Sequence, residues 1–155
     1  MRVKVAGLLK SPVGTVSTYR INEDLSLEGD GGCLLQGDAN LVRTRKGVMV
    51  TARFRVQVTV MCSRCLSMFE SPLSLDLQEE FLTGPAVNIP LAPGEEAFVI
   101  TKGRELDLGE AVRQYVALEV PLKPLCRSRC AGLCPRCGRN LNHESRVCSL
   151  VEAVN

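Results

Sequence analysis

The feature that most constrains the fold is a strict alternation of apolar and polar side chains between residues 48 and 60. Apolar side chains occupy every second position, at Val48, Val50, Ala52, Phe54, Val56, Val58 and Val60. The intervening positions are mostly polar, among them Arg53, Arg55 and Gln57. Because successive side chains of a strand point to opposite faces, the pattern predicts a long antiparallel strand with one buried face.

The segments around this strand predict further antiparallel strands. Arg45, Lys46 and Gly47 predict a hairpin turn that joins it to a strand within residues 34–44. A two-residue and a three-residue turn would give opposite registers, and the weak alternation of the first arm does not decide between them. Other strands are expected over residues 2–8, 14–21, 72–81 and 98–101, with a proline-rich loop over 82–97.

One amphipathic helix is predicted to begin after Asp107, which can cap it, with Glu110 three residues later. Apolar residues then recur at helical spacing until Pro121, at Leu108, Ala111, Val112, Tyr115 and Val116. The predicted class is α+β, mainly antiparallel β-sheet with one principal helix and a cysteine-rich, zinc-binding C-terminal tail. We expect a β-rich α+β domain over residues 1–121 and a cysteine-rich tail over residues 122–155. A bound metal ion is expected to attach the tail to the domain.

The cysteines predict the metal. Cys62 and Cys65 form a C-x-x-C pair after the alternating strand, and the tail adds Cys126, Cys130, Cys134, Cys137 and Cys148 together with His143, the only histidine. A C-x-x-C turn supplies half of a tetrahedral zinc shell, so each pair needs another. An iron–sulfur cluster is an alternative, whereas a redox dithiol fits poorly because no helix starts after Cys65. Cys33 is interpreted as a small buried hydrophobe.

Two pairings of these ligands are open. In the first, the Cys62 and Cys65 pair meets Cys126 and Cys130, which leaves Cys134, Cys137, Cys148 and His143 for a second site. In the second, the two C-x-x-C pairs combine as in a zinc ribbon. Either arrangement closes a long loop, so metal binding is expected to stabilise the fold strongly.

Charge is segregated along the chain, although the net charge is only +2. Residues 39–69 and 121–143 contain bases and no acid, and both blocks contain cysteine pairs. One interpretation is ordinary solvated faces. The other is a single basic surface that binds RNA where the cysteines meet, formed by Arg43, Arg45, Lys46, Arg53, Arg55, Arg64, Lys123, Arg127, Arg129, Arg136 and Arg139.

Several classes of protein are disfavoured by composition. No apolar run is long enough for a membrane span or a signal-peptide core, so a cytoplasmic protein with reduced thiols and no membrane partner is expected. Aromatic residues make up 4% of the chain and Trp is absent, which disfavours base-stacking platforms. A single histidine and a cysteine-rich shell fit a catalytic zinc site poorly, so we predict neither an enzyme nor a small-molecule substrate.

The motifs also resemble a known family. The chain contains V-M-C-S-R-C-L, then D-L-G-E-A-V, L-E-V-P-L-K-P-L-C and C-R-S-R-C-A-G-L-C-P-R-C-G-R-N-L-N. These segments resemble the bacterial YceD family, and the resemblance implies a role in the accumulation, processing or stability of large-subunit ribosomal RNA without catalysis. Some relatives lack the G-L-C-P-x-C-G portion, which implies the pairing of Cys62 and Cys65 with Cys126 and Cys130.

Two functions follow from these expectations. The first is a non-catalytic zinc-binding factor that supports ribosomal RNA accumulation, processing or ribosome assembly. The alternative is a protein-interaction module for a ribosomal protein without direct RNA contact, in which the acidic stretches over residues 21–38 and 70–119 meet a basic partner.

Overall fold

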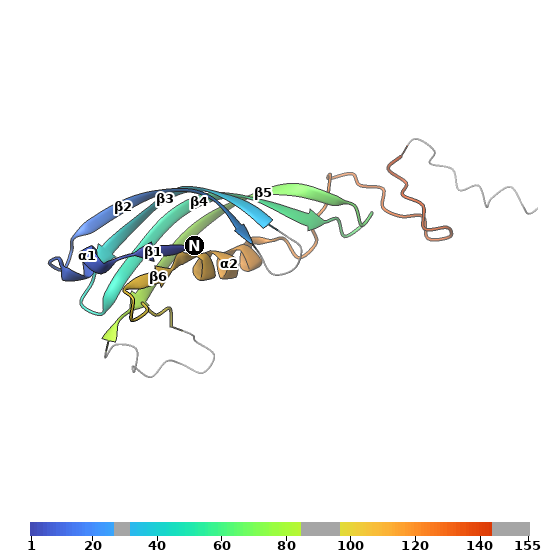
Figure 1. Cartoon of the computed structure of the whole chain (residues 1–155). Helices are drawn as coiled ribbons and strands as arrows, with labels where there is room; N and C mark the ends of the chain where they lie inside the picture. Colours follow the sequence, from blue (N-terminus) through green and yellow to red (C-terminus); the bar gives the residue numbers. More distant parts are fainter. Residues whose placement is uncertain (27–31, 85–96, 144–155) are drawn as a thin grey trace, which may run out of the picture.

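A four-stranded antiparallel sheet dominates the structure, a computed structural model that describes residues 1–26, 32–84 and 97–143. The sheet order is β2-β3-β4-β5, and β1 pairs with β6 in a separate two-stranded sheet. The strands are β1 (Arg2–Lys4), β2 (Val16–Ser26), β3 (Gly32–Arg43), β4 (Gly47–Met61), β5 (Met68–Leu82) and β6 (Glu105–Asp107), and the helices are α1 (Ala6–Lys10) and α2 (Leu108–Glu119). The large sheet arches over α2, and the described part of the tail runs from α2 toward the turn between β4 and β5 (Figure 1).

Strand β4 confirms the predicted alternation. Its even-numbered residues from Val48 to Val58 are buried, whereas Arg53 and Arg55 are exposed on the other face. The hairpin before it uses a two-residue turn, because the backbone N–H of Thr44 donates to the carbonyl of Gly47 at 3.0 Å. This turn sets the register that the sequence left open: Leu41 faces Val50 on the buried side.

Helix α2 forms over the predicted range and packs on the buried face of the sheet. Asp107 Oδ1 accepts a hydrogen bond from the backbone N–H of Glu110 at 3.3 Å, so the expected cap is present. The Glu110 carboxylate does not complete a capping box; it pairs with Arg113 at 2.6 Å. The helix buries the predicted stripe in one core with the sheet, at Leu108, Ala111, Val112 and Val116. The result is an α+β fold of mostly antiparallel sheet.

Several predicted strands have other bounds than expected, and one does not form. The strand expected over 2–8 ends at Lys4, because the Val5 N–H bonds to the carbonyl of Arg104 at 3.0 Å and the chain then turns into α1. Residues 98–101 form a single parallel bridge, Leu82 with Val99, and no strand. Strand β5 starts before residue 72 and tolerates Pro72, because an edge strand has a neighbour on one side only.

Two further predictions concern the limits of the fold. Most of the loop expected over 82–97 lies outside the described residues, and the division of the chain at residue 121 stays a prediction. Within the described residues, no helix has the length and apolar character needed to cross a membrane.

Candidate metal centre

Four cysteine sulfurs come together where β4 meets the tail. The Sγ atoms of Cys62, Cys65, Cys126 and Cys130 all lie within 4.8 Å of one another. Two of the separations, Cys62 to Cys130 and Cys65 to Cys126, are 3.7 Å. A tetrahedral zinc ion with Zn–S bonds of about 2.3 Å would hold its sulfurs about 3.8 Å apart. The donor set and its spacing therefore fit a tetrahedral metal ion, and none of the four cysteines forms a disulfide.

The first pair is held by the turn between β4 and β5. The Leu66 N–H donates to the carbonyl of Cys62 at 3.0 Å, and the Cys62 N–H donates to the carbonyl of Ser67 at 2.9 Å. Leu66 adopts a φ of 59°, in the left-handed region that few non-glycine residues occupy. This tight turn places both sulfurs on one side of the chain and buries them, with Cys62 at 0% and Cys65 at 5% exposure.

Hydrogen bonds from the surrounding chain prepare two of the sulfurs for the thiolate form. The backbone N–H of Cys126, helped by those of Cys65 and Arg64, lowers the pKa of Cys62 to about 6. The hydroxyl and then the backbone N–H of Ser67 lower the pKa of Cys65. Burial has the opposite effect on Cys126, whose pKa it raises to about 12. The surroundings thus favour the thiolate form at Cys62 and Cys65 and the protonated thiol at Cys126.

Backbone contacts bring the tail to this turn. The carbonyl of Pro124 accepts from the backbone N–H of Ser63 at 2.8 Å and from its hydroxyl at 2.9 Å. Arg64 Nη1 donates to the carbonyl of Cys130 at 3.0 Å. Gly132 has a φ of 76°, and a Cβ there would lie 3.2 Å from the carbonyl oxygen of Arg64. The two halves of the site therefore meet through close backbone contacts as well as through sulfur.

The sequence did not point to Asn142, whose side chain supports the part of the site formed by Cys126 and Cys130. Its Nδ2 lies 3.3 Å from the sulfur of Cys130, and its Oδ1 accepts from the Ala131 N–H at 2.8 Å. Arg127 Nε also donates to Asn142 Oδ1, at 3.2 Å. The only trace of this role in the sequence is the N-L-N segment that follows the last C-x-x-C pair. Groups that orient metal ligands in this way tune both the geometry and the affinity of a site.

The second C-x-x-C pair lies apart from the four-cysteine group. Cys134 is buried and Cys137 is exposed. Their turn is closed by the Gly138 N–H, which donates to the carbonyl of Cys134 at 2.9 Å, and Gly138 adopts a φ of 70°. The four sulfurs that come together are those of the first predicted pairing and not of the zinc ribbon, and the second site of that pairing stays a prediction. His143 is exposed, and Cys148 lies outside the described residues.

Cys33 lies in the main core, outside the four-cysteine group. It is 3% exposed in the main core and faces Val58 across the β3–β4 pair. Burial raises the pKa of this thiol, which agrees with the interpretation as a small buried hydrophobe.

Basic residues gather on the segments that carry the metal centre. All are exposed, and none forms an ion pair with another residue in the described part of the chain: Arg64, Lys123, Arg127, Arg129, Arg136 and Arg139. Residues 121–143 contain no acid that would neutralise them. We call these six residues the metal-end basic patch.

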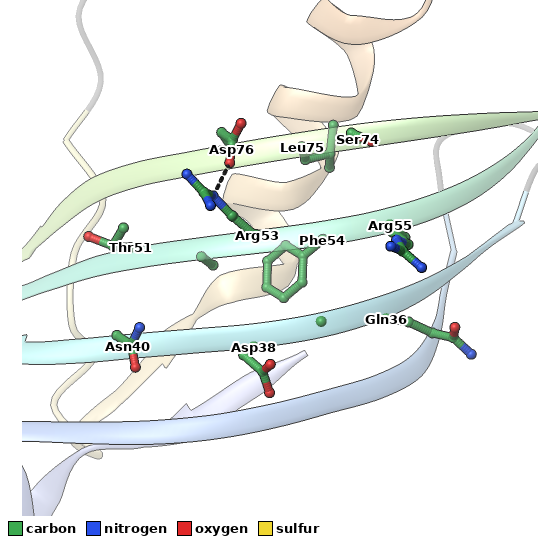
Figure 2. A pocket seen from close by; sticks show the side chains of 12 residues that line it. Gln36, Asp38, Asn40, Thr51, Arg53, Phe54, Arg55, Ser74, Leu75 and Asp76 are labelled. Carbon is green, nitrogen blue, oxygen red and sulfur yellow. Dashed lines mark hydrogen bonds and ion pairs between the residues drawn. The ribbon is translucent and has the colours of Figure 1, made fainter.

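The remaining predicted RNA-binding residues lie elsewhere. Arg53 and Arg55 project from the outer face of the sheet, where Figure 2 shows Arg53 paired with Asp76 at 2.9 Å. Arg20 and Asp38 continue the same row across the sheet, 3.4 Å apart. By register, this face carries three arginines against five acids: Arg20, Arg53 and Arg55 against Asp24, Asp38, Glu70, Asp76 and Glu80. It is therefore not a basic surface.

Arg43, Arg45 and Lys46 occupy the hairpin between β3 and β4, at the far end of the sheet from Cys62. Strand β4 has 15 residues, so its ends are roughly 45 Å apart along the strand. The single basic surface expected from the sequence does not form. Bases separated by a long strand reach opposite ends of the molecule, even though the sequence places them in one block.

Comparisons with known proteins agree with the motifs. Residues 50–153 match the family described as "Large ribosomal RNA subunit accumulation protein YceD". An uncharacterized protein of Mycobacterium tuberculosis is 31% identical over 115 residues, which cover 74% of this chain and 55% of the relative. The Arabidopsis thaliana "Large ribosomal RNA subunit accumulation protein YCED homolog 1, chloroplastic" is 28% identical in an alignment of 160 residues. The alignment covers 86% of this chain and 49% of the relative.

This chain thus spans about half the length of these curated relatives. No solved structure matches it. The family match covers more than half of the chain and includes the C-x-x-C turn and the described tail. The chain belongs to the YceD family.

Proposed function

We propose that this protein is a non-catalytic zinc-binding factor that supports the accumulation of large-subunit ribosomal RNA by contacting RNA through the metal-end basic patch. The observation that carries the proposal is that four clustered sulfurs lie on the same segments as six exposed bases, none of which forms an ion pair within the described residues. The printed description of the family supports the ribosomal RNA part.

Zinc is the proposed ion because four cysteine sulfurs at tetrahedral spacing suit it best among common structural metals. All four positions of the shell would be filled by protein, which leaves none for a reacting water, and this supports a structural role and the absence of catalysis. Thiols that serve as metal ligands also fit a reducing compartment such as the cytoplasm.

A second zinc ion is proposed at the other C-x-x-C pair, with Cys134, Cys137, Cys148 and His143 as ligands. The tight turn between Cys134 and Gly138 supports it, since such a turn presents two sulfurs to one ion. In this proposal the four-cysteine site joins the tail to the sheet, and the second site organises the tail itself.

RNA is the proposed ligand of the basic patch because arginine recognises phosphate through several charge-assisted hydrogen bonds. Arg64 and Arg127 are already oriented by hydrogen bonds to Cys130 and Asn142. Metal binding would therefore fix the position of part of the patch. The contacts would be mainly to the RNA backbone, so they would weaken steeply with added salt.

The alternative function, docking of a ribosomal protein without RNA contact, is favoured by the acidic balance of the outer sheet face. A basic ribosomal protein would complement that face. Pull-down with and without nuclease treatment separates the two functions. A ribosomal-protein contact that survives nuclease favours the alternative, and a contact that disappears with the RNA favours the first proposal.

The direct test measures the affinity for ribosomal RNA fragments at several salt concentrations. The test variant is Arg129→Gln/Arg136→Gln/Arg139→Gln, since these residues make no side-chain hydrogen bond within the described chain. The control is Arg2→Gln/Arg20→Gln/Arg113→Gln, which removes three arginines that are ion-paired far from the metal. We expect the test variant to bind roughly tenfold or more weakly with a shallower salt dependence. Equal affinities for both variants would refute the RNA interface.

A further inference from the structure

A pocket of about 440 Å³ lies at the hairpin end of the sheet, opposite the metal centre. Four cationic side chains and two threonines line it: Lys10, Arg43, Thr83, Thr101, Lys102 and Arg104. None of the described residues that line it is acidic. In a chain with nearly balanced charge, four bases around one pocket mark it as a place for an anion.

These residues reach the pocket from four separate parts of the chain. Lys10 ends α1, Arg43 ends β3, Thr83 follows β5, and Lys102 and Arg104 lie in the turn before β6. Backbone hydrogen bonds hold the segments in place. The Thr83 N–H donates to the carbonyl of Lys46 at 2.9 Å, and the Arg104 N–H donates to the carbonyl of Thr101 at 2.8 Å.

Arg43 is the least solvated of the four cations. Its Nη1 donates to the carbonyls of Thr44 and Gly47, the latter at 2.7 Å, which fixes the guanidinium group. Its Nε is buried and has no hydrogen-bond partner, alone among buried side-chain nitrogen and oxygen atoms in the described residues. Arg43 is therefore fixed in the wall of the pocket by its own backbone contacts, whereas Lys10, Lys102 and Arg104 are exposed and supply the charge that faces solvent.

We propose that this pocket binds a phosphate group. Phosphate has several strong acceptor oxygens, and arginine, lysine and threonine are the side chains that commonly donate to it. The pocket, at about 440 Å³, has room for a phosphate group that is part of a larger molecule. The site extends the proposed function because it gives the protein a second place that binds an anion. This place lies roughly 45 Å along β4 from the metal-end basic patch.

The test follows backbone amide NMR shifts during titration of the full chain with inorganic phosphate at constant ionic strength. The variant Lys10→Gln/Lys102→Gln removes two exposed charges of the pocket, so its folding is not at risk. The control Arg20→Gln/Arg113→Gln removes two charges that are ion-paired elsewhere. We expect phosphate to shift amides around residues 10, 43, 83 and 102, and the pocket variant to bind roughly tenfold more weakly than the control.

Equal affinity of the two variants, or equal shifts with chloride at matched ionic strength, would overturn the proposal. In a second arm, a short RNA is added to the Arg129→Gln/Arg136→Gln/Arg139→Gln variant, in which RNA contact at the metal-end basic patch is weakened. Displacement of phosphate by this RNA identifies the phosphate as that of an RNA backbone. Phosphate binding without displacement identifies the ligand as a small phosphate compound. Because inorganic phosphate is the probe, the pocket is tested even if RNA binding at the metal end fails.

Discussion

The backbone carbonyl of Pro124 accepts two hydrogen bonds from Ser63, one from its N–H at 2.8 Å and one from its hydroxyl at 2.9 Å. Ser63 follows Cys62 and Pro124 precedes Cys126 by two residues. This single contact therefore aligns both halves of the metal centre. Part of the entropy loss of bringing the tail to the β4–β5 turn is offset by hydrogen bonds and not by the metal alone.

Ser63→Ala is expected to weaken zinc binding moderately. The variant loses the hydroxyl bond and keeps the backbone bond, so the expected change is about 1 kcal/mol, or roughly fivefold in affinity. Competition with a chromogenic chelator measures it. Ser74→Ala, on the exposed face of β5, is the matched control. If the two variants bind zinc equally tightly, the alignment role of Ser63 is wrong.

Asn142→Ala is expected to have a larger effect on the same site. The side chain contacts the Cys130 sulfur and accepts hydrogen bonds from Ala131 and Arg127. Loss of such support typically lowers metal affinity about 10-fold to 100-fold. Asn40→Ala, which removes an amide bonded to Thr18 on the outer sheet face, serves as the control. Unchanged zinc affinity in Asn142→Ala would show that the amide has no part in holding the ligand.

Zinc stoichiometry distinguishes the two proposed sites. We expect two equivalents per chain, with Cys62→Ser and Cys134→Ser each losing one independently. The reason is that Cys134 lies outside the four-sulfur group, so the two ions would share no ligand. Elemental analysis of the purified variants provides the measurement, with Cys33→Ala as the control that retains both ions. Loss of one shared equivalent from either serine variant would support the zinc ribbon instead.

Removal of metal is expected to release the tail and leave the sheet folded. The main core and the small core around Cys62, Cys65 and Cys130 are separate clusters, so the larger one does not depend on the site. Hydrogen exchange after chelation should therefore rise in residues 62–67 and 124–142 and stay low in β3 and β4. Cooperative loss of protection across the whole chain would contradict this independence.

The elements that could be predicted were those whose pattern is local. The alternation from Val48 to Val58 and the stripe behind Asp107 each carry a complete periodic signature, so β4 and α2 appear where expected. The first strand was predicted over residues 2–8, but it ends at Lys4. Val5 continues its alternation, but its N–H bonds to Arg104 and the chain turns into a helix. That partner lies a hundred residues away, and no local pattern reveals it.

By itself the sequence determined the antiparallel sheet, the capped helix and a set of cysteines too closely spaced to be unrelated. The spacing of the cysteines left two pairings open, and the tertiary structure brings Cys126 and Cys130, not Cys134 and Cys137, to Cys62 and Cys65, as the family resemblance implied. Tertiary structure also places Arg43 and Arg64 at opposite ends of β4, although both belong to the same basic block of the sequence. The physical reason is the same in both cases. The type of a residue indicates what it can bind but not which distant residues it will meet. The length of β4 and the path of the chain after α2 determine which cysteines and which bases come together.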